Sequence, residues 1–357
     1  MSILTPRSNR YDRNLFINGN FDFFRYGTAG NLGYVADRFR TSGSGNGQGT
    51  AALLQSKNTD VPFGGGNSMQ LECIGLASPD PTDSLGFVSI MEGADIEEYL
   101  GQEVTFGAHF KANHTGTYGV GFNVGAGEFS YVSALTIDTA DVWQFHTFTV
   151  TLPSSVAAPL DNTNGFALVI ELMESSAFST STLDQIISGN KRGIAGQKNL
   201  FDNIGNTLKV AKVQLLKGSG ISPTEFVRRG FDKAEELQKC KRYMRKTYSE
   251  EVTPGTITSS GRYSHAHFET NSNVLDSVTH HFGESMRAAP QMTAYSYNTG
   301  AANQCLYVTA ASSSSVHPVN FYEETEKGFS YGATGTVGGT RGNAALMLFH
   351  WVARAEL

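Results

Sequence analysis

Residues 13–28 read RNLFINGNFDFFRYGT and place large aromatic side chains close to the start of the chain. These are Phe16, Phe21, Phe23, Phe24 and Tyr26. The first residues of most chains are frayed, so a dense aromatic cluster there needs a structural reason. The apolar run is too short to span a membrane, and it lacks the small-residue cleavage site of a signal peptide. We therefore expect this stretch to form a strand that is tucked into a folded core.

The composition favours a chain of strands and turns. The 357 residues suffice for two domains of ordinary size, each able to bury roughly 70% of its unfolded surface. The chain has 39 glycines, 23 phenylalanines, 14 tyrosines and only 17% charged residues, which favours a mostly β protein over one with long surface helices. The formal net charge of -6 gives no general attraction for phosphate backbones or anionic lipid. We therefore expect no nucleic-acid partner and no membrane insertion.

The cysteines do not form the pattern of a disulfide framework. Cys73, Cys240 and Cys305 are odd in number and far apart in the sequence. Small secreted domains instead carry a dense, even set of cysteines. A reducing site of synthesis fits this usage.

Alternating apolar and polar residues predict a β-hairpin over residues 104–124. The segment VTFGAHFK at 104–111 places Val104, Phe106, Ala108 and Phe110 on one face, as a half-buried strand does. The segment TYGVGFNV at 117–124 repeats the alternation, with Tyr118, Val120, Phe122 and Val124 directed inward. The turn residues ANHTG at 112–116 separate the two segments, so we expect the strands to pair.

Further short strands predict an N-terminal jelly-roll β-sandwich over residues 1–226. The candidate strands lie at 128–138, 143–152 and 165–172. The closing strand lies in TLKVAKVQLLKG at 207–218, where the apolar phase changes from Leu208 and Val210 to Val213 and Leu215. This change of phase predicts a β-bulge near Ala211.

One helix is expected to link this domain to a second domain. The segment DKAEELQKCKRYMRK at 232–246 begins with Asp232 and Glu235 in capping-box spacing and ends in basic residues, as helix ends prefer. We place this linking helix within residues 227–247. After Tyr248 the sequence again shows short β-like segments, which predict a C-terminal β domain over residues 248–357.

Several motifs of this chain resemble those of bacteriophage virion proteins, namely tail-fibre or receptor-binding proteins. The opening NLFINGNF at 14–21 and ADRF at 36–39 resemble that group's opening pattern. The segment from KVQLLKGS at 212–219 through PTEF at 223–226 to CKRY at 240–243 resembles its domain junction. MRAAP at 286–290 and AEL at 355–357 complete the match in the same order.

This resemblance implies how the protein would be organised and where it would act. It implies an N-terminal domain like a carbohydrate-binding module, in which Phe16, Phe21 and Phe23 anchor the first strand and Asn18 to Asn20 form a turn. It also implies a homotrimer that is made in the bacterial host cytoplasm, is built into the virion beside other virion proteins, and meets the host surface polysaccharide.

The sequence shows no catalytic constellation. The motifs H-E-x-x-H and Walker A are absent. Asp80, Asp83, Glu97 and Glu98 could supply the carboxylate pair of a glycosidase, but nothing in the sequence fixes the separation of roughly 5 to 10 Å that the reaction needs. We therefore expect no catalytic residues and no enzyme activity.

Calcium is the metal that the sequence leaves open. The turns DNTNG at 161–165 and FDNIGN at 201–206 carry oxygen ligands of the kind that calcium prefers. Asp161 and Asp202 are the candidate ligands. Asparagine, aspartate and glycine also serve turns without any ion, so both interpretations stand.

A sugar-binding surface is expected on the polar face of the predicted hairpin. His109, Lys111 and Asn123 would lie beside Gly119 and Gly121, whose missing side chains would leave a shallow groove. The same glycines could instead admit a neighbouring strand or subunit. The alternative binding site is in the C-terminal domain, at Tyr295, Tyr297 and Tyr322.

The sequence therefore predicts a non-enzymatic fibre protein that attaches to host cell-surface glycan. Two alternatives remain. The protein could be a purely structural head or tail fibre or decoration protein, or it could be a depolymerase that cuts the glycan.

Overall fold

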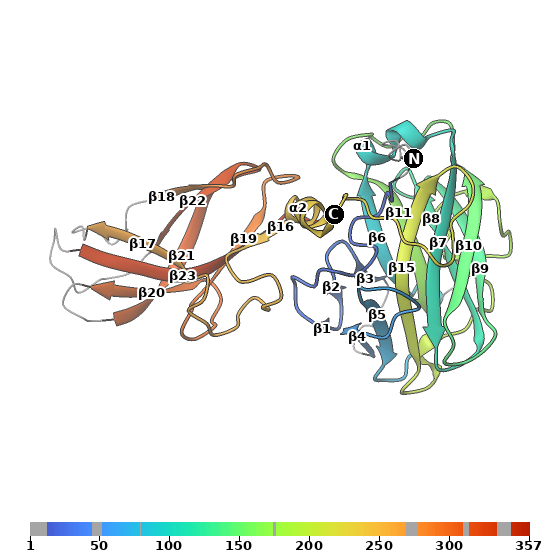
Figure 1. The fold of residues 1–357 in the computed structure, drawn as a ribbon, viewed down its shortest axis with the longest axis horizontal. Helices are drawn as coiled ribbons and strands as arrows, with labels where there is room; N and C mark the ends of the chain where they lie inside the picture. Colours follow the sequence, from blue (N-terminus) through green and yellow to red (C-terminus); the bar gives the residue numbers. More distant parts are fainter. Residues whose placement is uncertain are drawn as a thin grey trace, which may run out of the picture. The chain divides into compact units, whose positions relative to one another are not determined.

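The computed structural model describes residues 13–44, 52–78, 80–173, 176–268, 278–309, 314–333 and 344–357. The chain is mostly β, as the sequence predicts, and divides into two compact units (Figure 1). The first unit comprises residues 1–24, 28–237 and Leu357, and the second comprises Arg25–Gly27 and Gln238–Glu356. Among the described residues, no helix is long and apolar enough to span a membrane.

The first unit is a β-sandwich of two antiparallel sheets. The six-stranded sheet has the order β1 (Ala29–Gly30), β4 (Leu53–Asn58), β5 (Ser68–Cys73), β15 (Thr207–Lys217), β7 (Glu103–Ala112) and β10 (Gln144–Thr151). The seven-stranded sheet has the order β13 (Ile186–Ser188), β9 (Phe129–Ile137), β8 (Gly116–Val124), β11 (Asn164–Met173), β6 (Ser84–Glu92), β3 (Arg40–Ser44) and β2 (Gly33–Tyr34). The connecting segments add the parallel pair β12 (Ser179–Thr180) and β14 (Gly193–Ile194), the short helix α1 (Gly93–Ile96) and the 3₁₀ turns Glu97–Tyr99 and Leu200–Asp202.

The aromatic residues of the predicted strands form the core between the sheets. Phe106 and Phe110 of β7, with Phe122 of β8 and Phe166 of β11, are fully or almost fully buried. The Phe122 ring contacts those of Phe106 and Phe166, at 5.9 and 4.6 Å between centroids. Aromatic pairs at such separations add to the stability that burial alone gives. The alternation of apolar residues therefore predicted the buried face of each strand correctly.

The predicted hairpin over residues 104–124 is wrong. β7 belongs to the six-stranded sheet, where it pairs with β15 and β10, whereas β8 belongs to the seven-stranded sheet, where it pairs with β9 and β11. The turn at 113–115 thus carries the chain from one sheet to the other. Two amphipathic strands joined by a short turn can either pair side by side or face each other across a core, and their alternation is the same in both cases.

The stretch 13–28 is buried, but it is not the strand that we expected. It forms turns, and Phe16, Phe21 and Phe24 lie in the core, whereas Phe23 is only half-buried. Asn18 and Phe21 have positive φ angles of 61° and 50°, which strand backbone does not adopt. The turn over Asn18 to Asn20 is present, and the amide of Phe21 donates to the carbonyl oxygen of Asn18 at 2.8 Å.

The bulge predicted near Ala211 is confirmed. The register of β15 against β7 shifts between Ala211 and Gln214, and Lys212 has a φ of 54°. The shift lets Val210 and Val213 both face the core, where each is fully buried. A β-bulge of this kind moves the apolar phase of a strand by one residue.

The predicted helix is shorter than expected. α2 spans Lys233–Lys241, and the Asp232 carboxylate caps it by accepting a hydrogen bond from the amide of Glu235 at 2.9 Å. Residues Met244–Lys246 are not helical but form β16, which pairs with β23. The pairing buries Met244 completely in the second unit. This tertiary contact outweighs the local helix preference of the basic residues.

The second unit is an eight-stranded sheet assembly. β23 (Ala344–Arg354) pairs with β16, β17 (Tyr263–Phe268), β19 (Gln291–Tyr295) and β20 (Gln304–Thr309), and β21 (Ser314–Thr325), β22 (Gly328–Ala333) and β18 (Val278–His281) follow β20 in order. Its core is rich in aromatic residues, including Phe329, Tyr331 and Phe349. The three cysteines, one in this core and two elsewhere, are buried and form no disulfide with one another.

Candidate functional site

A hollow of about 170 Å³ lies on the outer face of the seven-stranded sheet. Strands β3, β6, β8 and β11 contribute to it, together with the segment that precedes β14. Its floor is apolar and consists of Val88, Ile90, Ala167 and Val169. Its polar side chains are Arg40, Ser42, Asn123, Asn164, Asn190 and Arg192.

The floor exists because β6 and β11 carry apolar residues on both faces. Val169 lies directly opposite Val88 and Ala167 lies opposite Ile90 in the pairing of these strands. The four side chains form a small cluster that is separate from the core between the sheets, and Leu357 packs against it. Apolar residues on the outer face of a sheet often mark a surface that another group covers.

Three side chains of the hollow have polar atoms that the described residues leave unsatisfied. Nε of Arg40, Oδ1 of Asn164 and Nε of Arg192 are buried and have no hydrogen-bond partner there. Native proteins pair nearly all buried polar atoms with protein groups or water. These atoms are therefore available to water or to a ligand that enters the hollow.

Aromatic rings hold the two guanidinium groups of the hollow in place. The Arg40 guanidinium lies 5.6 Å from the centroid of the Tyr34 ring, and the Arg192 guanidinium lies 4.1 Å from that of Phe178. Burial lowers the pKa of Arg192, and the nearby Glu171 carboxylate opposes this shift. Guanidinium and amide groups above an apolar floor suit a ligand that has both hydroxyl groups and apolar ring faces.

The residues of the predicted sugar-binding face do not lie on one surface. His109 and Lys111 belong to β7 in the six-stranded sheet, whereas Gly119, Gly121 and Asn123 belong to β8 in the seven-stranded sheet. The prediction that these five residues share a face depended on the hairpin and is wrong for the same reason. Only Asn123 lines the hollow, where its Nδ2 donates to Oγ of Ser130 at 2.9 Å.

His109 and Lys111 are both engaged within the protein. The His109 ring is 5% exposed and lies 5.3 Å from the ring of Phe63 and 4.8 Å from that of Phe145. Nζ of Lys111 lies 3.1 Å from the Asp60 carboxylate, which also pairs with Lys209. The hydrogen bond from Lys209 holds the pKa of Asp60 well below its usual range. The outer face of β7 is therefore packed rather than open.

The two glycines of β8 admit neighbouring backbone, which is the alternative that the sequence left open. A Cβ atom on Gly119 would lie 2.7 Å from Cα of Gly193. A Cβ atom on Gly121 would lie 1.8 Å from the carbonyl oxygen of Tyr131 on the adjacent strand β9. Real Cβ atoms do not come so close to backbone, so the glycines serve packing at these positions.

We expect the sandwich to lose stability in mild acid because of His109. Burial lowers the pKa of His109 to about 4, below the usual value of 6.5. The unfolded chain therefore takes up a proton at this site below pH 6.5, while the folded state stays neutral down to about pH 4. Stability from this site is complete above pH 6.5 and is lost as the pH falls toward 4. Replacing His109 with glutamine is expected to make the fall in melting temperature between pH 6.5 and 4 less steep, while burial of His114 and His146, which lowers the pKa of each, still contributes to it. An unchanged pH profile in His109→Gln would contradict this assignment.

The three candidate tyrosines of the second unit lie in different environments. Tyr295 packs against Tyr248 with 6.3 Å between ring centroids, and Tyr297 lies 4.6 Å from the Arg262 guanidinium. Tyr322 on β21 is 40% exposed. Of the three, Tyr322 has the most open ring.

The calcium candidates hold turns together. Oδ1 of Asp161 accepts hydrogen bonds from the amide and hydroxyl of Thr163 at 2.8 and 2.6 Å, and these bonds lower the pKa of Asp161. The Asp202 carboxylate pairs with Lys198 and accepts a hydrogen bond from Asn206 at 2.8 Å. Among the described residues, no group of three or more His, Cys, Asp or Glu side chains is placed to hold a metal.

A chelator test follows from this geometry. We expect excess EDTA to leave the melting temperature unchanged, because the Asp161 and Asp202 turns are closed by protein hydrogen bonds. A fall of several degrees that calcium restores would show that a bound ion stabilises the fold.

The sequence interpretation missed most of the hollow. No local motif marks Arg40, Asn164 and Arg192, because each lies on a different strand or loop. A signal was present in GFALVIEL at 165–172, where apolar residues occupy both alternating faces. Strands with two apolar faces are normally covered on both sides. The outer face of this strand is therefore a place to look for a binding surface.

Comparisons with known proteins gave matches only among solved structures. No protein-family model matches the chain, and no curated protein matches it. The enzymatically active domain of tailspike protein 4 of bacteriophage CBA120 is similar over 57% of this chain and 21% of its own, with 12% identity and a TM-score of 0.31. A CBM4 structure is similar over 56% of this chain and 98% of its own, with 12% identity and a TM-score of 0.30. The CBM22-1 and GH10 modules of the Clostridium thermocellum xylanase 10B, complexed with xylohexaose, are similar over 57% of this chain and 30% of their own, with 12% identity and a TM-score of 0.27.

Proposed function

We propose that this protein is a non-enzymatic component of a bacteriophage virion that attaches to host cell-surface glycan. The observation that carries the binding function is the hollow on the seven-stranded sheet. It combines an apolar floor with buried polar atoms of Arg40, Asn164 and Arg192 that have no partner among the described residues.

The chemistry of the hollow suits a saccharide. The C–H face of a sugar ring can pack on Val88, Ile90, Ala167 and Val169, while its hydroxyl groups both donate and accept hydrogen bonds. Guanidinium groups only donate and the asparagine side chains do both, so the hollow can pair with hydroxyls in either role. A saccharide therefore matches this mixed lining better than a purely apolar ligand does.

The virion location rests on the motifs rather than on the hollow. The segments at 14–21, 212–226, 286–290 and 355–357 resemble those of tail-fibre and receptor-binding proteins, in the same order. A single shallow site binds sugar weakly, and several copies in a symmetric assembly raise the overall affinity through multivalency. A virion fibre supplies such copies.

The experiment combines two substitutions in the hollow with a control on the other sheet. We expect Arg40→Gln with Asn164→Ala to abolish binding to host cells and to purified surface polysaccharide, because it removes two of the unpartnered polar groups. Lys111→Ala also removes a positive charge from the sandwich, but from the opposite sheet, and is expected to bind normally. Melting temperatures establish that each variant is folded.

Three results would contradict the proposal. Normal binding by the folded double variant would remove the hollow from the binding function. Absence of binding by the unaltered protein to any host strain or glycan would favour the purely structural fibre. Release of reducing sugar ends from the polysaccharide would show the depolymerase instead.

The assembly gives a further expected result. We expect light scattering of the purified protein to give three times the mass of one chain, as the resemblance to homotrimeric fibre proteins implies. Dissociation to monomers should weaken binding to immobilised polysaccharide strongly, since multivalency is then lost. A stable monomer at micromolar concentration would refute the trimer.

A further inference from the structure

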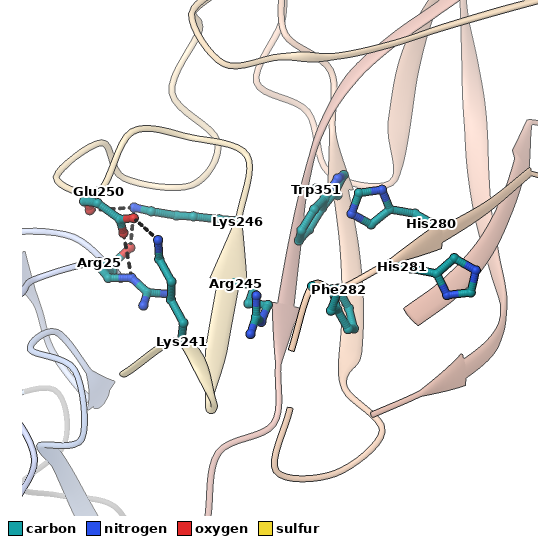
Figure 2. A pocket seen from close by; sticks show the side chains of 10 residues that line it. Arg25, Lys241, Arg245, Lys246, Glu250, His280, His281, Phe282 and Trp351 are labelled. Atoms are coloured by element: carbon teal, nitrogen blue, oxygen red, sulfur yellow. Dashed lines mark hydrogen bonds and ion pairs between the residues drawn. The ribbon is translucent and has the colours of Figure 1, made fainter. Parts of the chain in front are cut away.

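A second hollow, of about 160 Å³, lies wholly within the second unit (Figure 2). Arg25, Lys241, Arg245 and Lys246 contribute basic side chains to it. The opposite wall is formed by His280 and His281 of β18, by Phe282 directly after that strand, and by Trp351 of β23. Its volume is roughly ten times the space that one water molecule needs.

Three of the four cations are already engaged by protein groups. Nε of Arg25 lies 2.9 Å from Oε2 of Glu250, and Nζ of Lys241 lies 3.2 Å from Oε1 of the same carboxylate. Nζ of Lys246 donates to the backbone carbonyl oxygens of Arg25, Glu250 and Val252 at 2.7 to 2.8 Å. Glu250 is the acidic side chain that lines the hollow, so one carboxylate faces several cations.

Arg245 differs from the other three cations. Within the described part of the chain it has no hydrogen-bond or ion-pair partner, and its Nε is buried. Its guanidinium lies 5.7 Å from the centroid of the Phe282 ring, and Figure 2 shows it in the middle of the group with no dashed line to a neighbour. Burial lowers the pKa of Arg245, the charge of Glu284 opposes this, and that of Arg25 adds to it. A half-buried cation beside other cations destabilises the folded state unless an anion joins it.

A second buried donor of the hollow also lacks a partner. Trp351 is 6% exposed, and its Nε1 is buried with no hydrogen-bond partner among the described residues. The indole N–H can only donate, as can a guanidinium. The unsatisfied groups of Arg245 and Trp351 are therefore both donors, and an acceptor with negative charge would satisfy both kinds.

We propose that this hollow is an oxyanion-binding site, in which Arg245 is the principal ligand for a carboxylate or phosphate group. A guanidinium matches both groups because its N–H donors fit paired oxygen atoms. Lys241, Lys246 and Arg25 supply additional positive potential, and the apolar wall of Phe282 and Trp351 lowers the local dielectric, which strengthens the attraction. The site lies in the other unit from the sugar-binding hollow and does not depend on the proposed attachment function.

Trp351 provides the readout for a direct test. The chain has two tryptophans, and Trp143→Phe leaves Trp351 as the only one. We expect its fluorescence to change when this variant is titrated with sodium phosphate or with D-glucuronate at constant ionic strength, and not with glucose, which is neutral. A stronger response to phosphate identifies a phosphate ester as the natural group, and a stronger response to glucuronate identifies a sugar acid. No response to either oxyanion would overturn the proposal.

Arg245→Met, made in the same background, separates a binding role from a structural one. We expect its affinity for the oxyanion to fall by about 10- to 100-fold, because a charged hydrogen-bonding group is lost. Its melting temperature without ligand should stay the same or rise, since an unpaired cation is removed from a cationic cluster. The control is Lys327→Met, which removes an exposed cation of the same unit outside the hollow and should leave binding intact.

The thermal response gives a second, independent measurement. With oxyanion at tenfold its Kd, the second unit of the unaltered protein should melt about 5 °C higher, and Arg245→Met should show no such rise. A folded Arg245→Met variant that binds as tightly as the control would refute the assignment. The double variant Arg40→Gln with Asn164→Ala should keep the full rise in melting temperature with oxyanion. The test of oxyanion binding is therefore independent of the test of glycan attachment.

Discussion

Replacing Asn18 with alanine is expected to lower the free energy of unfolding of the sandwich by roughly 3 to 5 kcal/mol. Asn18 is 1% exposed, and its side chain makes three hydrogen bonds to backbone. Nδ2 donates to the carbonyl oxygens of Phe23 and Asp37 at 2.9 and 3.0 Å, and Oδ1 accepts from the amide of Phe23 at 3.0 Å. Alanine would leave the Phe23 amide and the Asp37 carbonyl oxygen without this partner in a buried site, where each costs about 1 to 3 kcal/mol. The Phe23 carbonyl oxygen keeps the hydrogen bond that it accepts from the Asp37 amide at 3.1 Å. Denaturant unfolding followed by circular dichroism measures the change.

Two companion variants identify the cause. Asn18 has a φ of 61°, which glycine adopts more readily than alanine, so Asn18→Gly should be less destabilised than Asn18→Ala by about 1 kcal/mol. Asn203→Ala removes an exposed asparagine from the same unit and should have little effect. A loss of less than about 1 kcal/mol in Asn18→Ala would show that the backbone groups find other partners.

This network explains the motif at the start of the chain. Asn14 closes a similar set, in which its Oδ1 accepts from the amides of Phe16 and Leu215 and its Nδ2 donates to the carbonyl oxygen of Val213. Gly19 lies close by, where a Cβ atom would come within 2.1 Å of that same carbonyl oxygen. Asn14 and Gly19 thus fasten the first residues to β15, whereas Asn18 holds the turn to Phe23 and Asp37. The resemblance to virion proteins at this motif therefore concerns how the domain is built.

Replacing Gly121 with alanine is expected to destabilise the sandwich by about 3 kcal/mol or more, because the added methyl group overpacks the sheet. The new Cβ would lie 1.8 Å from the carbonyl oxygen of Tyr131 and 3.0 Å from Cα of Val132. Both neighbours are backbone of β9, so no side chain can rotate away and the two strands must separate. Thermal unfolding and the chemical shifts of β8 and β9 would report the change.

The matched control is a glycine with free space around it. A methyl group added at Gly65 would have no neighbour within 4 Å, and Gly65 has no positive φ, so Gly65→Ala should be neutral or slightly stabilising. If Gly121→Ala were as stable as this control, the close approach of β8 to β9 would not hold in solution. The groove interpretation of Gly121 would then become open again.

The two sheets of the sandwich differ in what their outer faces offer. On the six-stranded sheet, His109 is packed between aromatic rings and Lys111 is paired with Asp60. On the seven-stranded sheet, the hollow beside β6 and β11 retains polar atoms without partners among the described residues. The proposed attachment function is therefore assigned to one face of the unit. The sequence offered residues from both.

The sequence predicted the strands because burial follows alternation. Phe106, Phe110, Tyr118 and Phe122 are buried as the period of two requires, and the bulge in β15 is marked by the change of apolar phase at Ala211. The start of the helix was predictable as well, because Asp232 caps it through a local hydrogen bond. Each of these features depends on residues that are close together in the chain.

The errors arose where distant segments compete or meet. Alternation is the same whether β7 and β8 pair or face each other, so it could not assign them to separate sheets. The helix ends at Lys241 because residues 244–246 pair with β23, which lies at the other end of the second unit's sequence. Residues 13–28 are not a strand because Asn18 bonds to Phe23 and Asp37 and holds a positive φ.

The sequence by itself determined that the chain is mostly β, which residues face the core, and where the chain turns, since these depend on local periodicity and on turn residues. Only the tertiary structure decided which strands are neighbours and which surfaces stay open. Arg40, Asn164 and Arg192 come together from β3, β11 and a loop, and Arg25 reaches Arg245 from the far end of the sequence. Residues that are distant in the sequence meet in this way because of the order of the strands in each sheet. Backbone hydrogen bonding alone does not specify which strands pair, so this order is decided only when the whole core assembles.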